Sequence, residues 1–215
     1  MGPIKGILFE PVGCLAEFSP EPFLEIANRL FGRKIKPTRS ASRAYWHVLN
    51  LMEASQADSI EALEVAAVDG AVIYDDVIPA LAALKALGVK LFIASSLSSA
   101  AITRFLERCP YDFDAIWSRD NAGGIKSVPL TRALDAACLT PQQAIFLTDT
   151  AEGINVARGL GLNPMLMMND PDESKRLAMQ NPAGGVVSLH ELPDFIRFVR
   201  AEKADYFGAS GAPKL

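Results

Sequence analysis

The chain has 215 residues, of which 50% are hydrophobic and 21% are charged, and its formal net charge is -4. This length is enough for one packed core, or for a core with a small insert. The mildly acidic balance and the lack of a long run of Lys or Arg argue against nucleic acid or an anionic membrane surface as a partner.

Cysteine usage and the N-terminus point to a cytoplasmic protein. The three cysteines, Cys14, Cys109 and Cys138, are widely spaced and show no metal-binding pattern with the two histidines, which favours reduced thiols. The apolar stretch up to Phe9 is too short for a signal peptide, and no apolar run reaches the roughly 20 residues that span a bilayer.

Apolar periodicity predicts one strand, then a helical stretch, then alternating helices and strands. No strand is expected between Leu15 and Ala71. The expected strands are 4–9, 89–94, 114–117, 144–147, 164–168 and 185–187, and the expected helices are 21–31, 39–54, 59–68, 77–87, 99–108, 128–138, 150–159 and 192–203.

Alternation of helices with fully apolar strands is typical of a parallel sheet covered on both faces. We therefore predict an α/β fold with a Rossmann-like, doubly wound parallel sheet and a small helical cap inserted after the first strand. The predicted core domain comprises residues 1–15 and 75–205, the cap 16–74, and a flexible tail 206–215.

Polar residues follow three of the predicted strands, where parallel sheets bind their ligands. Glu10 follows the first strand, Ser95 and Ser96 follow the strand at 89–94, and Asp149 follows the strand at 144–147. Two carboxylates suit a hard cation such as Mg²⁺, and a hydroxyl with neighbouring N–H groups suits phosphate oxygens. Lys126, in a loop before a helix, would balance the charge of a phosphate ligand.

Plainer roles remain open for the same residues. Ser95 and Ser96 would equally serve as caps of the next helix, and Asp149 as the cap of the helix that follows it. Lys126 would also suit a solvated loop. In the cap, Arg39 and Arg43 lie one turn apart and could reach an anion, but a solvated helix face is the favoured interpretation.

Four segments in order carry a family resemblance. Residues 7–15 read Ile-Leu-Phe-Glu-Pro-Val-Gly-Cys-Leu, and residues 91–96 form an apolar strand ending in Ser-Ser. Residues 118–129 contain Lys126 and Pro129, and residues 145–149 form an apolar strand ending in Thr-Asp. With a helical insert after the first strand, this order resembles the haloacid dehalogenase (HAD) superfamily, in particular its phosphoglycolate-phosphatase-like branch.

The resemblance implies a Mg²⁺-dependent phosphatase of small phosphate esters. In the family, the first aspartate of motif one attacks phosphorus, a second aspartate two residues later is the general acid and base, and a motif-four aspartate helps to bind Mg²⁺. By position, Glu10 is the nucleophile, and Ser95, Ser96 and Lys126 hold the phosphate. Glu10, the backbone carbonyl of Val12 and Asp149 are the metal ligands.

The chain departs from that pattern at Glu10 and Val12, which replace the two aspartates, and at Cys14, which replaces the threonine of motif one. It also departs at Gly153, where motif four often has a second acidic residue. Glu10 has one methylene more than aspartate, and misplacing a reacting group by about 1 Å can cost about 10²-fold in rate. Val12 cannot transfer a proton, which costs a further 10²–10⁴-fold or so. We therefore expect weak or absent catalysis with Mg²⁺ bound weakly if at all. The alternatives are a binding or regulatory module for a phosphorylated metabolite, other small anion or protein partner, and a structural subunit.

Overall fold

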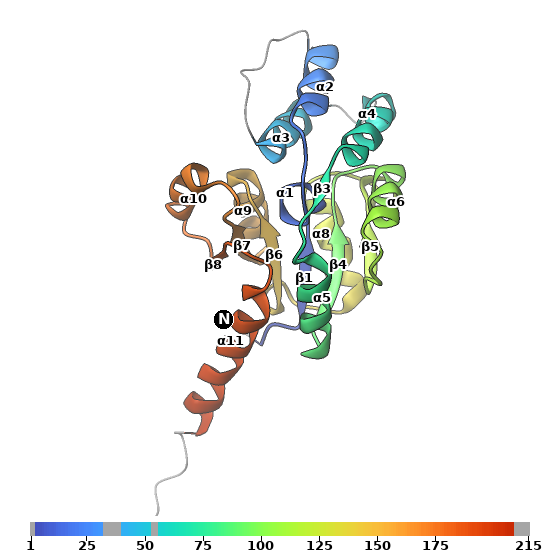
Figure 1. Ribbon diagram of the computed structural model, residues 1–215. Coiled ribbons are helices and arrows are strands. Elements are labelled where there is room, and N and C mark those ends of the chain that lie inside the picture. Colours follow the sequence, from blue (N-terminus) through green and yellow to red (C-terminus); the bar gives the residue numbers. More distant parts are fainter. Residues whose placement is uncertain (1–2, 32–39, 53–55, 209–215) are drawn as a thin grey trace, which may run out of the picture.

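A six-stranded parallel sheet forms the centre of the protein (Figure 1). The computed structural model describes residues 3–31, 40–52 and 56–208. The strand order is β5-β4-β1-β6-β7-β8, and each adjacent pair is parallel. The bounds are β1 Gly6–Phe9, β4 Lys90–Ala94, β5 Ala115–Trp117, β6 Ala144–Thr148, β7 Asn163–Met167 and β8 Gly184–Val186. The predicted doubly wound α/β fold is confirmed.

Helices cover both faces of this sheet, because successive side chains of a strand point to opposite faces. In β1, Ile7 and Phe9 belong to the core cluster that includes residues of α5, α6 and α11, whereas Leu8 belongs to the cluster with α8 and α9. Burial on both faces explains why these strands are continuous apolar runs. The bounds are α5 Val77–Ala86, α6 Ser99–Arg108, α8 Ser127–Ala137, α9 Ala151–Gly159 and α11 Glu191–Gly208.

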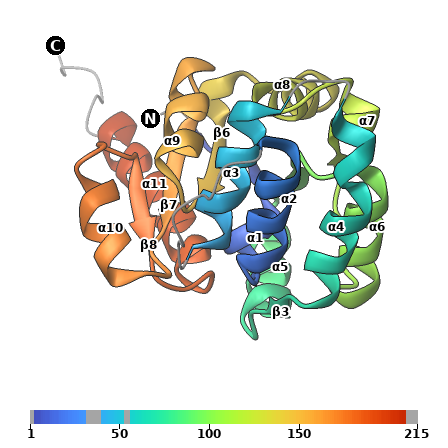
Figure 2. The ribbon, with the colours of Figure 1, turned by 90° about the horizontal axis from the view of Figure 1, so that it is seen from above.

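Three helices, α2, α3 and α4, interrupt the sheet after β1, and they lie together above it in Figure 1. Viewed from above, in Figure 2, α3 lies toward α9 and α10, and α4 lies beside α6. Their bounds are α2 Glu21–Phe31, α3 Ala41–Leu51 and α4 Ala57–Asp69. Arg39 and the end of the helix predicted at 39–54 lie outside the described residues.

The chain enters and leaves this insert through two short strands. These are β2, Ala16–Glu17, and β3, Val72–Ile73, which pair antiparallel. The expectation of no strand between residues 15 and 71 is wrong at β2, because two residues are too few to show a period. The boundaries proposed for core and cap stay a prediction.

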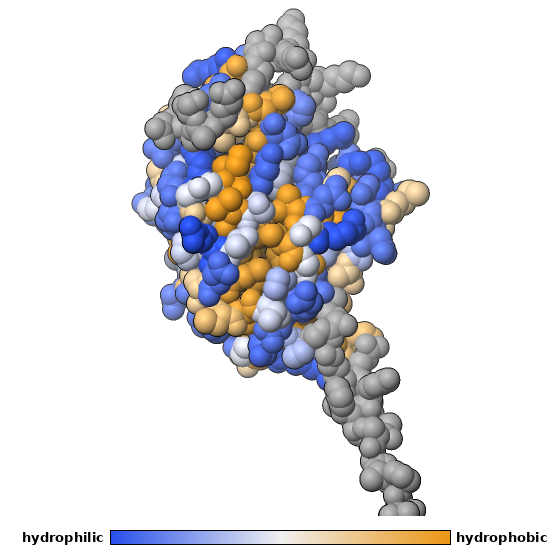
Figure 3. All heavy atoms as spheres, turned by 180° about the vertical axis from the view of Figure 1, so that it is seen from behind, coloured by the Kyte–Doolittle hydropathy of each residue, from blue (hydrophilic) through white to orange (hydrophobic). Residues whose placement is uncertain are grey.

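Several short elements have no counterpart in the sequence prediction, namely α1 Pro11–Cys14, α7 Arg119–Ala122, η2 Pro141–Gln143 and α10 Pro171–Ala178. Helix α11 continues to Gly208, past the predicted start of the tail, and residues 209–215 lie outside the described part. On the face seen in Figure 3, apolar residues gather in the middle with hydrophilic ones around them. In the described ranges, no helix has both the length and the apolar character needed to cross a membrane.

Candidate functional site

Glu10, Ser95 and Asp149 follow three neighbouring strands at the middle of the sheet. Strand β1 pairs with β4 on one side and with β6 on the other, with Phe9 opposite Ile93 and Leu147. Because all three strands run in the same direction, their carboxyl ends meet at one edge. The fold therefore brings these predicted site residues into one region.

Glu10 is buried and hydrogen-bonded to Ser95. Its side chain is 5% exposed, and Ser95 Oγ donates a hydrogen bond of 2.6 Å to Glu10 Oε1. Burial raises the pKa of the Glu10 carboxyl to about 8, although hydrogen bonds from Ser95 and from the backbone of Val12 and Ser96 oppose this rise; the charge of Asp149 adds to it. Without a bound cation, the Glu10 carboxyl is therefore mostly protonated at pH 7.

Val12 and Gly13 shape the turn after Glu10. The Val12 side chain is fully buried in the main apolar cluster. Gly13 has a φ of 77°, and a Cβ there would lie 2.1 Å from Asp149 Oδ2 and 2.2 Å from Ser42 Oγ. A glycine at this position thus allows both side chains to approach the backbone of the turn.

Asp149 is held by groups from two other parts of the chain. Ser42, in the first turn of α3, and Asn169, which follows β7, hydrogen-bond to its carboxyl. The Asn169 amide also donates to the Gly13 carbonyl at 2.7 Å. Burial raises the pKa of Asp149 to about 6, against the effect of these hydrogen bonds.

The two serines after β4 do not cap the next helix. Ser98 caps α6, since its side chain accepts a hydrogen bond from the Ala101 N–H. Ser95 instead donates to Glu10, and Ser96 Oγ accepts a hydrogen bond of 2.8 Å from the backbone N–H of Lys126. The capping alternative is therefore wrong for Ser95 and Ser96.

Asp149 is not a helix cap either, since Thr150 occupies that position in α9 and its side chain accepts from the Gly153 N–H. The loop of Lys126 reaches the site through its backbone, which has a φ of 59°. Lys126 is partly exposed, and within the described ranges its ammonium makes no hydrogen bond or ion pair. Cys14 is buried, and burial raises the pKa of its thiol well above the usual range, which fits a packing role.

A cavity of about 440 Å³ opens beside Asp149. Glu10, Ser95, Ser96 and Lys126 do not line it. Sequence analysis missed Ser42, Tyr74 and Asn169 as site residues, and no motif marks them. The cavity is lined by Gly13, Glu17, Phe18, Ser40, Ala41, Ser42, Tyr74, Asp149, Asn169, Asp170, Pro171 and Glu173.

The model of one protein family, described as haloacid dehalogenase-like hydrolase, matches residues 23–167. The chain belongs to this family. The match begins after the turn that contains Glu10 and Val12, and it includes Ser95, Lys126 and Asp149. No curated protein matches the sequence.

Solved structures of HAD proteins share the fold. A predicted phosphatase from Clostridium acetobutylicum is 19% identical, with a TM-score of 0.71 over 90% of this chain and 98% of its own. A haloacid dehalogenase-like hydrolase family protein from Streptococcus pneumoniae is 17% identical, with a TM-score of 0.67 over 91% and 99%. L-2-haloacid dehalogenase from Xanthobacter autotrophicus is 15% identical, with a TM-score of 0.62 over 90% and 98%.

HAD phosphatases generally use Mg²⁺, and the donor set of this chain fits that ion poorly. Carboxylate oxygens are present, but hydrogen bonds already engage them. Glu10 Oε1 accepts from Ser95, and the Asp149 carboxyl is hydrogen-bonded to Ser42 and Asn169. Within the described ranges no three acidic, histidine or cysteine side chains converge. We therefore derive no chemical step that passes through a metal ion.

Proposed function

We propose that this HAD protein acts by binding a ligand or partner, and that its hydrolysis of small phosphate esters is weak or absent. The observation that carries this proposal is the bond between Ser95 and the buried Glu10 carboxyl. Glu10, at the nucleophile position, thereby accepts the hydrogen bond of the Ser95 hydroxyl, which would otherwise be donated to a phosphate oxygen.

The chemistry of attack supports the same conclusion. A carboxyl must be ionised to attack phosphorus, and burial keeps most of Glu10 protonated at neutral pH. The side chain that would replace a general acid, Val12, is apolar and buried. The missing acid alone costs about 10²–10⁴-fold in rate, and protonation of the nucleophile lowers the rate further.

Binding has a place in the structure. The cavity beside Asp149 is large enough for a small metabolite, and it lies between the start of α3 and the start of α10. Among the described residues, the lining of this cavity holds no basic side chain and four carboxylates, those of Glu17, Asp149, Asp170 and Glu173. The phosphorylated or other anionic ligand that we propose therefore suits the loops of Ser96 and Lys126 better than this cavity, and a protein partner is the alternative. We also place the protein in the cytoplasm, a location that the three free thiols support.

The test is an assay of purified protein with p-nitrophenyl phosphate, with Mg²⁺ or with EDTA. Wild type is compared with Glu10→Asp, Glu10→Ala, and Glu10→Asp combined with Val12→Asp. We expect little turnover from wild type and more from the double variant. Because Val12 is buried, circular dichroism must first show that the double variant folds. If the double variant does not fold, the comparison of wild type with Glu10→Asp is the test.

Glu107→Asp is the matched control, because this carboxylate is exposed and does not line the cavity. Mg²⁺-dependent turnover by wild type that Glu10→Ala abolishes would show that Glu10 is catalytic and that the proposal is wrong. The binding part is tested separately, by the thermal shift of wild type with inorganic phosphate and by copurification of a partner. If neither is seen, the binding proposal fails.

A further inference from the structure

A buried ion pair joins the inserted helices to the sheet. Glu64, in α4, is 0% exposed, and Arg119, at the start of α7, is 4% exposed. Arg119 Nη1 lies 2.6 Å from both carboxylate oxygens of Glu64. Of the ion pairs between described residues, this is the one in which both side chains are buried.

The pair is anchored to the loop that follows β4. The Ser98 N–H donates to Glu64 Oε2 at 3.3 Å, and Arg119 Nη1 donates to the Ser96 carbonyl at 3.2 Å. The Arg119 backbone N–H also donates to the Leu97 carbonyl at 3.1 Å. These contacts hold residues 96–98, directly after the serine that binds Glu10.

The same carboxylate reaches a second inserted helix. The Tyr45 hydroxyl, in α3, donates to Glu64 Oε1 at 3.3 Å, and Tyr45 is fully buried. Burial alone would lower the pKa of the Arg119 guanidinium, but the Glu64 carboxylate beside it raises that pKa above the usual range. The guanidinium therefore stays charged, while burial raises the pKa of Glu64 against the opposing effects of Arg119 and of the Ser98 N–H. With Arg119 Nη1 at 2.6 Å from both of its oxygens, Glu64 is the acceptor that faces this charge.

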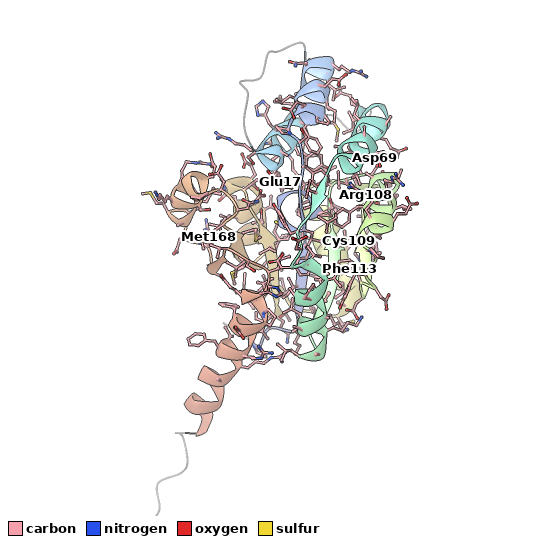
Figure 4. All side chains as sticks on the ribbon, viewed as in Figure 1. Glu17, Asp69, Arg108, Cys109, Phe113 and Met168 are labelled. Atoms are coloured by element: carbon pink, nitrogen blue, oxygen red, sulfur yellow. The ribbon has the colours of Figure 1, made fainter. Side chains whose placement is uncertain are left out.

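Elsewhere along α4, Ile60, Ala67 and Val68 pack in the main apolar cluster, and the remaining polar contacts are more exposed than the Glu64–Arg119 pair. Arg104 of α6 lies 2.6 Å from Asp69 with both side chains about half exposed, and Arg108 donates to the carbonyls of Val68 and Ala71. Figure 4 shows Asp69 and Arg108 near the place where α4 meets α6. Exposed ion pairs of this kind contribute little to stability. Arg104→Met is therefore a matched control at the same contact between α4 and α6.

From this geometry we infer that the Glu64–Arg119 pair is a latch. It fixes the inserted helices onto the sheet and holds the loop of residues 95–98 in the form in which Ser95 binds Glu10. The chain connects the insert to the sheet only through β2 and β3, so side-chain contacts must set its position. This role does not depend on whether Glu10 is catalytic.

The experiment is amide hydrogen exchange on the full chain, read out residue by residue, for Glu64→Leu, Arg119→Met, the double variant and Arg104→Met. Removing one partner leaves a buried unpaired charge, so each single variant is expected to open α2–α4 about 10²–10³-fold more often. Amides of β1 and β6 should keep their protection, and Arg104→Met should change little.

The double variant leaves no unpaired charge, so its helices should open less often than those of either single variant. The Ser98 amide, which loses its Glu64 acceptor, should still exchange faster than in wild type, and this readout holds even if a single variant does not fold. Equal acceleration in α4, β1 and β6, or additive effects of the two substitutions, would overturn the latch. So would an unchanged Ser98 amide in the double variant.

Discussion

Replacing Glu10 by glutamine should stabilise the protein at neutral and alkaline pH. Glutamine keeps the shape of the protonated carboxyl and can still accept the hydrogen bond from Ser95, but it cannot ionise. The pKa of Glu10 rises from an ordinary 4.5 to about 8 on folding, mainly because the group is buried. Between these values the folded state binds more protons than the unfolded chain, so stability is highest below pH 4.5 and falls as pH rises to 8.

The size of this effect follows from the two pKa values. At about 1.4 kcal/mol for each pH unit, ionising Glu10 fully in both states lowers the free energy of unfolding by about 5 kcal/mol. The part lost between pH 5 and pH 7 is roughly 2–3 kcal/mol. The Glu10→Gln variant should therefore gain that amount over wild type between those two pH values.

The assay is urea unfolding of wild type and Glu10→Gln at a series of pH values, with EDTA present throughout. Subtracting the two curves removes the contribution of titrating groups distant from Glu10, but not that of Asp149, whose charge is coupled to Glu10. The exposed substitution Glu17→Gln is the control and should change stability by less than about 0.5 kcal/mol at every pH. A constant difference between wild type and Glu10→Gln from pH 5 to pH 8 would refute the burial argument.

Three further substitutions test the packing of the site. Gly13→Ala should cost about 2–4 kcal/mol of unfolding free energy in a urea titration, because its Cβ would meet Asp149 and Ser42 at a positive φ; an unchanged midpoint would show that the turn can shift. Gly153→Asp, which restores the acidic residue of the family motif, should lower the melting temperature, since a Cβ there would lie 2.0 Å from Thr148 Oγ1. Ser42→Ala should raise the pKa of Asp149 further above about 6, because a hydrogen bond that favours the ionised form is lost; NMR titration of the Asp149 carboxyl carbon measures this, and an unmoved pKa contradicts the assignment.

The sheet could be predicted because its strands carry a strong local signal. The run from Leu91 to Ala94 is buried on both faces, as is the run from Ile145 to Thr148, so both are continuous apolar stretches. Parallel strands then place Glu10, Ser95 and Asp149 at one edge by topology alone. The family resemblance added the roles that these positions have in related enzymes.

The contacts that distinguish this site could not be predicted, since they join residues far apart in the sequence. Ser42 and Asn169 reach Asp149 from α3 and from the end of β7, and neither belongs to a motif. The Glu64–Arg119 pair depends on how α4 packs against the loops after β4 and β5. In the sequence, both residues look like ordinary surface charges.

The changes at the family's catalytic positions are physically linked. Two carboxyl groups in a region of low dielectric repel each other unless a cation lies between them or one takes up a proton. Here Glu10 is mostly protonated at neutral pH, and hydrogen bonds from Ser42 and Asn169 compensate Asp149. An apolar residue such as Val12 is then tolerated beside them, because both carboxyl groups are compensated without it. Restoring one aspartate leaves the other groups in place, so Glu10→Asp alone should recover less phosphatase activity than Glu10→Asp with Val12→Asp. If the single variant is as active as the double one, the missing acid at Val12 does not limit the rate, and the argument that the two changes are linked is wrong.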